Sequence, residues 1–323
     1  MRVQRYGSAG IVAALVLLMA GVVCSGEPAL SGHSTVLSVV RGRPFVMVTV
    51  NGKGPFRFLL DTGTGGSAMV TEELADELHL PAAGEAQLND PSGMGGRSAP
   101  MVRIDSLDVA GVQFAGIKAV RHAIPGAEGK CLGMLGFPLF RQWLLTVDYL
   151  HQRLTLTDGA LAPDGERRVL PFRMQDGVPV VKLRLGGADG SQVEAQLDTG
   201  GGGLSLPEPV AARLRFAQGP EVFGKAESLS TRFALRVGKL AGDVHLGVYT
   251  LDRPWVEINP AFPLANVGGI PLQYFALTFD QRSGLVRFES PLRHIKLGVT
   301  PAPTELVNKP PINPVQQGLT PVG

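Results

Sequence analysis

Short stretches of the chain alternate apolar and polar positions, which is the pattern of β-strands with one buried face. Every second residue is valine over 46–50, and every second residue is apolar over 193–197. Glycine and proline, at 42 and 25 of 323 residues, separate these stretches, as in a protein built from strands and tight turns. The pattern predicts an all-β chain with short helices.

The sequence contains two copies of one arrangement. Residues 42–78 align with 176–214, and each segment contains two alternating strands, a glycine-containing turn, an Asp-Thr-Gly tripeptide and a short helix signal. Further along, residues 133–156 align with 266–288. Two homologous units within one chain are the simplest account.

The segments that end the two units are expected to form hairpins, with turns at 150–152 and 281–284. Asp148 and Asp280 stand just before these turns. Aspartate at such a position commonly binds its own backbone, so we interpret this pair as structural.

Helix signals are brief and follow each tripeptide. Thr71 is suited to cap a helix that carries Leu74 and Leu78, and Pro207 is suited to begin a helix that extends to Leu214. Each unit is therefore predicted to carry one short helix on a framework of strands.

The first residues differ from the rest of the chain. Arg2 and Arg5 precede an apolar run over 11–23, followed by small residues, which is the layout of a secretory signal peptide. We expect a secreted or periplasmic protein, with lipidation at Cys24 or an uncleaved signal anchor as alternatives and otherwise no stable membrane span. The expected organisation is a signal peptide at 1–26, an N-terminal lobe at 34–156, a linker at 157–168, a C-terminal lobe at 169–290 and a proline-rich, disordered tail at 291–323.

Charge and composition narrow the function. The net charge is +2 and the basic residues are scattered among acidic ones, so we expect no nucleic-acid partner. Cys24 and Cys131 are the two cysteines of the chain, which excludes a disulfide framework and zinc sites built from cysteine pairs. The six histidines form no His-Glu-x-x-His pair, and no phosphate-binding loop of the P-loop type occurs. We expect neither a metal nor a cofactor.

The two tripeptides place Asp61 and Asp198 at the ends of apolar strands. Duplicated units that pack about a pseudo-twofold axis bring equivalent loops together, so the two carboxylates are expected to face each other. Carboxylates about 3 Å apart share one proton. The ionised member accepts a proton from water while the protonated member polarises a peptide carbonyl. A glycosidase pair, with carboxyls about 5 to 9.5 Å apart, fits the repeated threonine and glycine less well.

These motifs resemble the aspartic proteases of the pepsin and retropepsin type over about residues 40–290. The apolar-apolar-Gly element of that family is matched at 134–136 and, more weakly, at 267–269. The resemblance implies a monomer with two β-barrel lobes related by a pseudo-twofold axis, a peptide or protein substrate, and catalysis by Asp61 and Asp198. It also implies a supporting role for residues of the two loops, namely Thr62, Gly63, Thr64, Thr199 and Gly200.

The family also closes a hairpin flap over its substrate, and residues 89–100 fall in the matching interval. Glycines at the tip suit a mobile segment that excludes water. The resemblance implies substrate-binding flap residues at Gly93, Met94, Gly95 and Gly96. The equivalent region of the second unit, 223–230, lacks that density of glycine.

One departure concerns the residue after each tripeptide. Thr64 offers a hydroxyl to its aspartate, whereas Gly201 has none. Because an extra hydrogen bond favours the charged carboxylate, we hypothesise that Asp61 is the charged member and Asp198 the protonated one. Gly201 also leaves open a catalytically inactive, retropepsin-like peptide-binding or scaffold protein of the cell envelope. Since both aspartates are present, the sequence predicts an aspartic endopeptidase.

Overall fold

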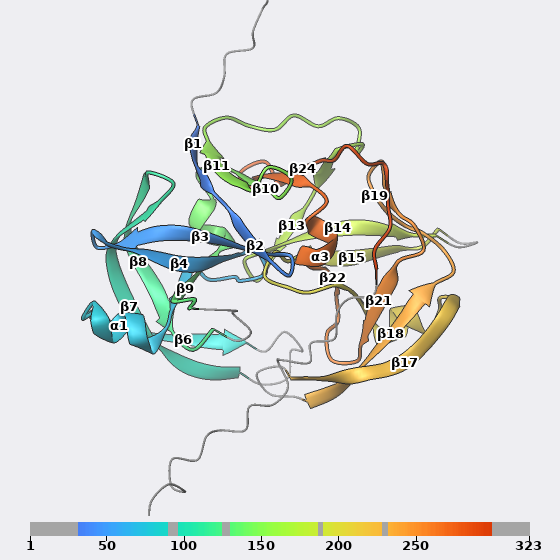
Figure 1. The fold of residues 1–323 in the computed structure, drawn as a ribbon, viewed down its shortest axis with the longest axis horizontal. Coiled ribbons are helices and arrows are strands. Elements are labelled where there is room, and N and C mark those ends of the chain that lie inside the picture. Colours follow the sequence, from blue (N-terminus) through green and yellow to red (C-terminus); the bar gives the residue numbers. More distant parts are fainter. Residues whose placement is uncertain (1–31, 90–95, 125–129, 187–189, 228–231, 299–323) are drawn as a thin grey trace, which may run out of the picture. The chain divides into compact units, whose positions relative to one another are not determined.

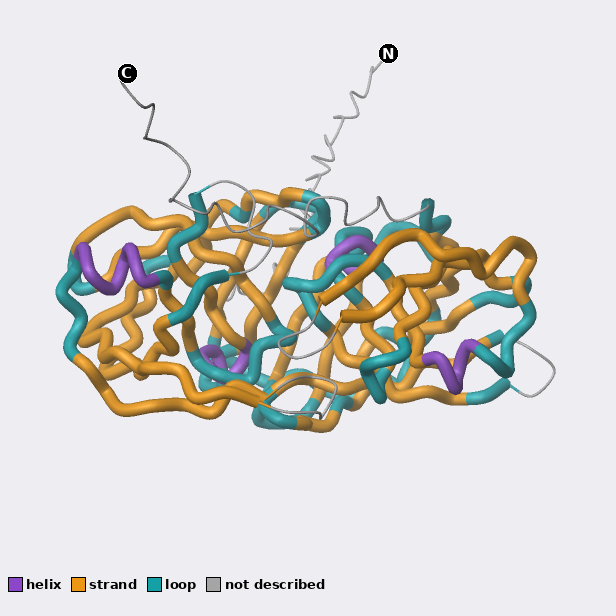
Figure 2. Tube along the Cα trace, turned by 90° about the horizontal axis from the view of Figure 1, so that it is seen from below, coloured by secondary structure: helices purple, strands orange, loops and turns teal. Residues whose placement is uncertain are grey.

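The computed structural model describes residues 32–89, 96–124, 130–186, 190–227 and 232–298. The chain is all-β with two lobes, as the alternating pattern predicts, and most of these residues lie in three β-sheets (Figure 1; Figure 2). The helical segments are short: α1 (Glu72–Glu77), the 3-10 segment η1 (Phe137–Phe140), α2 (Glu208–Ala211) and α3 (Gly269–Leu272). Within the described ranges, no helix has the length and apolar character needed to cross a membrane.

Lobe 1 is an eight-stranded sheet built from the first unit. Its central strands close into a ring because β3 pairs with β7 as well as with β4. In spatial order the strands are β2 (Ser38–Val40), β3 (Arg43–Val50), β4 (Lys53–Asp61), β9 (Gly133–Gly136), β5 (Ala68–Val70), β8 (Val112–Arg121), β7 (Gly96–Val109) and β6 (Ala82–Asn89).

Lobe 2 is an eleven-stranded sheet built mainly from the second unit. It repeats the strand order of lobe 1, but β14 pairs with β19 rather than with the counterpart of β7. In spatial order the strands are β17 (Phe216–Glu227), β18 (Arg232–Leu240), β21 (Trp255–Asn259), β16 (Leu204–Pro207), β22 (Ala265–Val267), β15 (Gln192–Leu197), β14 (Val178–Leu185), β19 (Val244–Leu246), β20 (Tyr249–Leu251) and β25 (His294–Ile295), with β13 (Arg173–Gln175) beside β14.

A third, six-stranded sheet joins the two units (Figure 1). Its central strands, β10 and β23, pair antiparallel with Thr146 opposite Thr278, and their hydroxyl oxygens lie 3.0 Å apart. The register is symmetric about this pair, so a pseudo-twofold axis passes between the two threonines. The strands are β1 (His33–Val36), β11 (Arg153–Thr157), β10 (Leu144–Asp148), β23 (Ala276–Asp280), β24 (Leu285–Glu289) and β12 (Val169–Pro171).

The core forms because the alternating strands turn one face inward. Every second residue over 46–50 is almost fully buried, and so are Leu60 and Leu197, which precede the two aspartates. These side chains belong to one large apolar cluster that runs through both lobes. The two Asp-Thr-Gly loops are therefore carried on strands that the core holds in place.

The predicted hairpins and the structural interpretation of their aspartates are confirmed. Asp148 accepts hydrogen bonds from the backbone N–H groups of Leu150 and His151. Asp280 is fully buried and is bound by Ser283, among other groups. Burial opposes its charged form, but hydrogen bonds from the Ser283 side chain and from backbone N–H groups hold the pKa of Asp280 below its usual value.

The predicted first helix is confirmed, whereas the second is shorter than expected. Thr71 caps α1, its hydroxyl accepting from Leu74 N at 3.2 Å. The second helix, α2, begins after Pro207 and ends at Ala211, and Leu214 packs on the core from outside it. No side-chain cap supports the start of α2.

The predicted tail begins too early. β25 pairs with β20 in parallel, and Ile295 and Leu297 are buried, so 291–298 is part of the folded body. The expected disordered tail is thus reduced to 299–323, which lies outside the described residues, as does the expected signal peptide. The expected linker carries no helix or strand over 158–168.

Candidate active site

Two strands deliver the aspartates to the axis. β4 ends at Asp61, and β15 ends one residue before Asp198. Each of these strands pairs in parallel with a later strand of its own unit. β4 pairs with β9, and β15 pairs with β22. Because these pairs lie in the interior of the sheets, the two loops are anchored on both sides.

The two loops approach each other closely enough to require glycine. A Cβ atom at Gly63 would lie 2.5 Å from Asp198 Oδ1, and one at Gly200 would lie 2.4 Å from Asp61 Cγ. Any side chain at these positions would overlap the opposite carboxylate. The sequence-predicted pair is therefore brought together, and the Asp61 and Asp198 side chains are hydrogen bonded to each other.

The loop threonines interlock across the axis. Thr62 Oγ1 donates to Leu197 O at 2.7 Å and accepts from Thr199 N at 3.0 Å. Thr199 Oγ1 makes the mirror-image bonds with Leu60 O and Thr62 N, at 2.7 and 3.0 Å. Both threonines are fully buried. This fixes the separation and orientation of the two carboxylates.

Each carboxylate accepts two further hydrogen bonds. Asp61 accepts from Gly63 N at 2.8 Å and from Thr64 Oγ1 at 3.0 Å. Asp198 accepts from Gly201 N at 2.8 Å and from Asn266 Nδ2 at 2.8 Å. The two aspartates are thus supported by equal numbers of donors.

Asn266 is the functional residue that the sequence analysis missed. It occupies the position of Met134, because β15 pairs with β22 in the register in which β4 pairs with β9. In lobe 1 the hydroxyl of Thr64 reaches both Asp61 and Met134 Sδ. In lobe 2 glycine replaces the threonine and Asn266 supplies the donor.

The predicted match of 134–136 with 267–269 is wrong by one residue. The counterpart of Gly136 is Gly268, since Gly136 precedes η1 and Gly268 precedes α3. The segment equivalent to 134–136 is therefore 266–268. In the corrected register, the sequence has a polar residue, Asn266, at the position equivalent to Met134.

The electrostatics of the pair favour a shared proton. Burial, the neighbouring charge of Asp198 and the hydrogen bond with Asp198 together raise the pKa of Asp61 to about 8, against weaker lowering by Thr64 and Gly63. The pair therefore keeps one proton at neutral pH. The reason for expecting Asp61 to be the charged member does not hold, because Asp198 also has a side-chain donor, Asn266.

Both lobes extend a hairpin on the same side of the molecule. β6 and β7 pair up to Asn89 and Gly96, and β17 and β18 pair up to Glu227 and Arg232. In Figure 1 the ends of both hairpins point toward each other. Of the predicted flap residues, Gly96 begins β7, while Gly93, Met94 and Gly95 lie outside the described residues.

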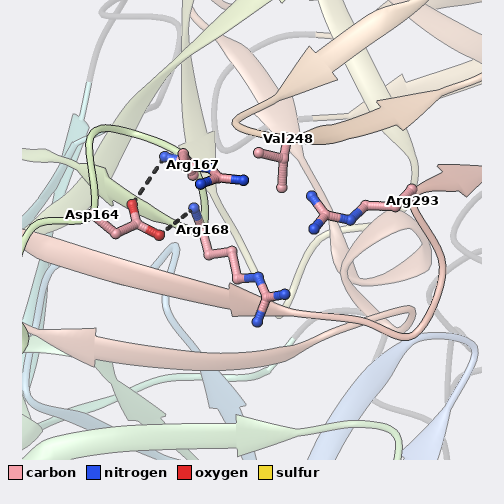
Figure 3. Close-up of a pocket in the computed structure, with 5 residues that line it drawn as sticks. All are labelled: Asp164, Arg167, Arg168, Val248 and Arg293. Carbon is pink, nitrogen blue, oxygen red and sulfur yellow. Dashed lines mark hydrogen bonds between the residues drawn. The ribbon is translucent and has the colours of Figure 1, made fainter.

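A separate concave surface lies at the start of β12 (Figure 3). It has a volume of about 280 Å³ and is lined by Asp164, Arg167, Arg168, Val248 and Arg293. The Asp164 carboxylate accepts hydrogen bonds from the backbone N–H groups of Arg167 and Arg168, so it closes a turn. The arginines there are exposed, and the surface offers no nucleophile or acid-base pair.

Comparison with known families agrees with the geometry of the first lobe. Residues 46–139 match a family model described as aspartyl protease. The matched segment runs from β3 into η1 and contains the first Asp-Thr-Gly loop; the second lies beyond it. No curated protein matches the chain. The match supports a hydrolase of the aspartyl protease class.

Proposed function

We propose that the protein is an aspartic endopeptidase in which Asp61 and Asp198 activate one water molecule. The observation that carries the proposal is the mutual approach of the two loops, in which each glycine leaves room for the opposite carboxylate. The equal hydrogen bonding of the two aspartates supports it, since neither half has lost its donors.

The chemistry follows from one shared proton. The ionised carboxylate takes a proton from the water molecule, which attacks the peptide carbonyl, while the protonated carboxyl donates to the carbonyl oxygen. As the C–N bond breaks, the base passes the proton that it took from water to the leaving amine, and a hydroxyl of the tetrahedral intermediate returns its proton to the acid as the product carboxyl group forms. The pair is then singly protonated again. Asp61 is the acid and Asp198 the base at the start of this cycle, as the raised pKa of Asp61 indicates.

An extended peptide would lie between the two hairpins and the dyad. Hairpin strands offer backbone N–H and C=O groups, which bind an extended chain as an added strand does. We propose a substrate outside the cytoplasm, because residues 1–26 have the layout of a signal peptide. Each lobe contributes one catalytic aspartate, so we expect the monomer to be active.

Hydrolysis of an unstructured peptide library by the purified chain tests the proposal. We expect internal cleavage products in mass spectra, with free carboxyl termini that carry ¹⁸O when the reaction runs in labelled water. Peptide binding without cleavage would contradict the proposal and favour the inactive scaffold protein. Absence of both binding and cleavage would contradict both readings.

The Gly201–Asn266 pair gives a sharper prediction about positioning. A Cβ atom at Gly201 would lie 2.5 Å from Asp198 Oδ2 and 2.9 Å from Asn266 Nδ2. Gly201→Ser should therefore displace the amide, and Asn266→Ala should remove the donor, each lowering kcat/KM about 10-fold or more. Asn266→Ala relieves only one of the two overlaps, because a Cβ atom at residue 201 would still lie 2.5 Å from Asp198 Oδ2. The double variant should therefore stay at least as impaired as Gly201→Ser, and native activity in the double variant would contradict this account.

A further inference from the structure

The two lobes differ in chemistry on the face that carries the aspartates. Side chains alternate along a strand, so Leu59 shares a face with Asp61 while Leu60 points into the main core. In the same way, Gln196 shares a face with Asp198 while Leu197 points into the core. The residues that pair with Leu59 and Gln196 on successive strands form one row in each lobe. Each row leads away from the dyad across the sheet.

In lobe 1 this cross-strand row is apolar. Strands β4, β9, β5, β8 and β7 lie side by side. Their registers pair one residue of each strand with one of the next, which gives a row of five residues across the sheet. Phe45, Leu59 and Met134 pack together with Met69 as an apolar cluster separate from the main core. The residues of the lobe 1 row are Leu59, Met134, Met69, Val120 and Met101.

In lobe 2 the equivalent row is mostly polar. Strands β15, β22, β16, β21 and β18 lie side by side in the same registers. An acidic side chain continues the row on β17, because Glu221 pairs with Val237. The residues of the lobe 2 row are Gln196, Asn266, Ser205, Glu257 and Val237.

The lobe 2 row presents one acceptor without a donor and one carboxylate without a cation. Asn266 Oδ1 is buried and has no hydrogen-bond partner among the described atoms. Glu257 receives a backbone hydrogen bond from Gly203, and no cation of the described ranges forms an ion pair with it. A Cβ atom at Gly202 would lie 3.9 Å from Glu257 Oε1, which places the carboxylate beside the loop that follows Asp198.

We propose that the lobe 2 row is a specificity pocket for a lysine or arginine side chain of the substrate, with Glu257 as its anionic partner. The lobe 1 row accepts an apolar side chain on the other side of the cleaved bond. Glu257 is half-buried, and a carboxylate that is partly withdrawn from water without a cationic partner is costly; a substrate ammonium or guanidinium group relieves that cost. The inference rests on the proposed function and names its preferred substrate class.

Two peptides that differ in one ammonium group test the pocket. One carries lysine next to the cleaved bond and the other carries norleucine there, with an apolar residue on the opposite side in both. At pH 8 we expect the lysine peptide to have a kcat/KM about 10-fold or more above that of the norleucine peptide. Equal values, with both peptides cleaved, would overturn the pocket but leave the endopeptidase standing.

Glu257→Gln isolates the charge, because glutamine keeps the shape and an acceptor for Gly203. The lysine preference should fall to about twofold or less in this variant, whereas Glu77→Gln on the exposed face of α1 should leave it unchanged. A lysine preference that survives Glu257→Gln would overturn the assignment. If neither peptide is cleaved, the same two peptides are titrated into Asp61→Asn by calorimetry, and equal affinities there would overturn the pocket independently of hydrolysis.

The pH dependence of the lysine preference is a further test, because a merely structural role of Glu257 would not make that preference depend on pH. Burial raises the pKa of Glu257 to about 7, so its carboxylate is neutral below that pH and charged above it. Other charged groups on neighbouring strands of that face are Lys239 in β18, Glu221 in β17 and Asp198 beside Asn266. The lysine-to-norleucine ratio should rise from pH 6 to pH 8 more steeply in the native protein than in Glu257→Gln, in which only the dyad still titrates. The same pH dependence in both proteins would contradict the role of Glu257.

Discussion

Replacing either aspartate of the pair by asparagine is expected to lower kcat/KM toward peptides by about 1,000-fold or more. In Asp61→Asn the amide has no proton of the required acidity to donate to the carbonyl oxygen. In Asp198→Asn the base that accepts the proton of water is lost. Initial rates on one quenched fluorescent peptide, with active protein quantified by peptide binding, measure both losses.

Asp105→Asn serves as the matched control, since Asp105 is exposed and its side chain pairs with Arg103 on the surface. Its kcat/KM should stay within about twofold of the native value. Native-like rates in either dyad variant would show that the hydrolysis belongs to another site. A loss in Asp61→Asn alone would show that the two lobes do not act as one pair.

Removing the hydroxyl of Thr62 or Thr199 should produce the largest loss of stability. Thr→Val keeps the shape but leaves a buried carbonyl without its donor and a buried N–H without its acceptor. Each unsatisfied buried group costs about 1 to 3 kcal/mol, so we expect each variant to lower the free energy of unfolding by about 2 to 5 kcal/mol. Urea unfolding followed by tryptophan fluorescence measures the change.

Thr49→Val in β3 is the control for this series, because its hydroxyl makes no hydrogen bond in the described structure. Its free energy of unfolding should change by less than about 0.5 kcal/mol. If Thr62→Val and Thr199→Val were as stable as Thr49→Val, the cross-axis hydrogen bonds would not hold the two lobes together. Activity should fall along with stability, since the same bonds orient the carboxylates.

The strands and the duplication were predictable because they rest on local patterns. The alternation over 46–50 specifies which face is buried, and the core uses that face. The tripeptides at Asp61 and Asp198 mark equivalent turns, and pseudo-twofold packing then brings them together without further information. The cap at Thr71 is also local, since it needs a hydroxyl three residues before a backbone N–H.

The remaining features depend on strand register, which the sequence does not state. Asn266 reaches Asp198 because β22 lies beside β15, and an alignment shifted by one residue hides this contact. Glu257 stands in line with Asn266 through β16, a strand more than fifty residues away in the chain. The extent of α2 was mispredicted for a related reason: Leu214 contacts the core from outside the helix rather than from its next turn.

The most direct test of the shared-proton dyad is an NMR titration of the protein with ¹³C-labelled aspartate carboxyl groups. The account predicts that Asp61 titrates near pH 8, the value to which burial and the charge of Asp198 raise its pKa, and that Asp198→Asn lowers that pKa. A resonance of Asp61 that titrates near pH 4 in the native protein, or that does not move in Asp198→Asn, would contradict the account.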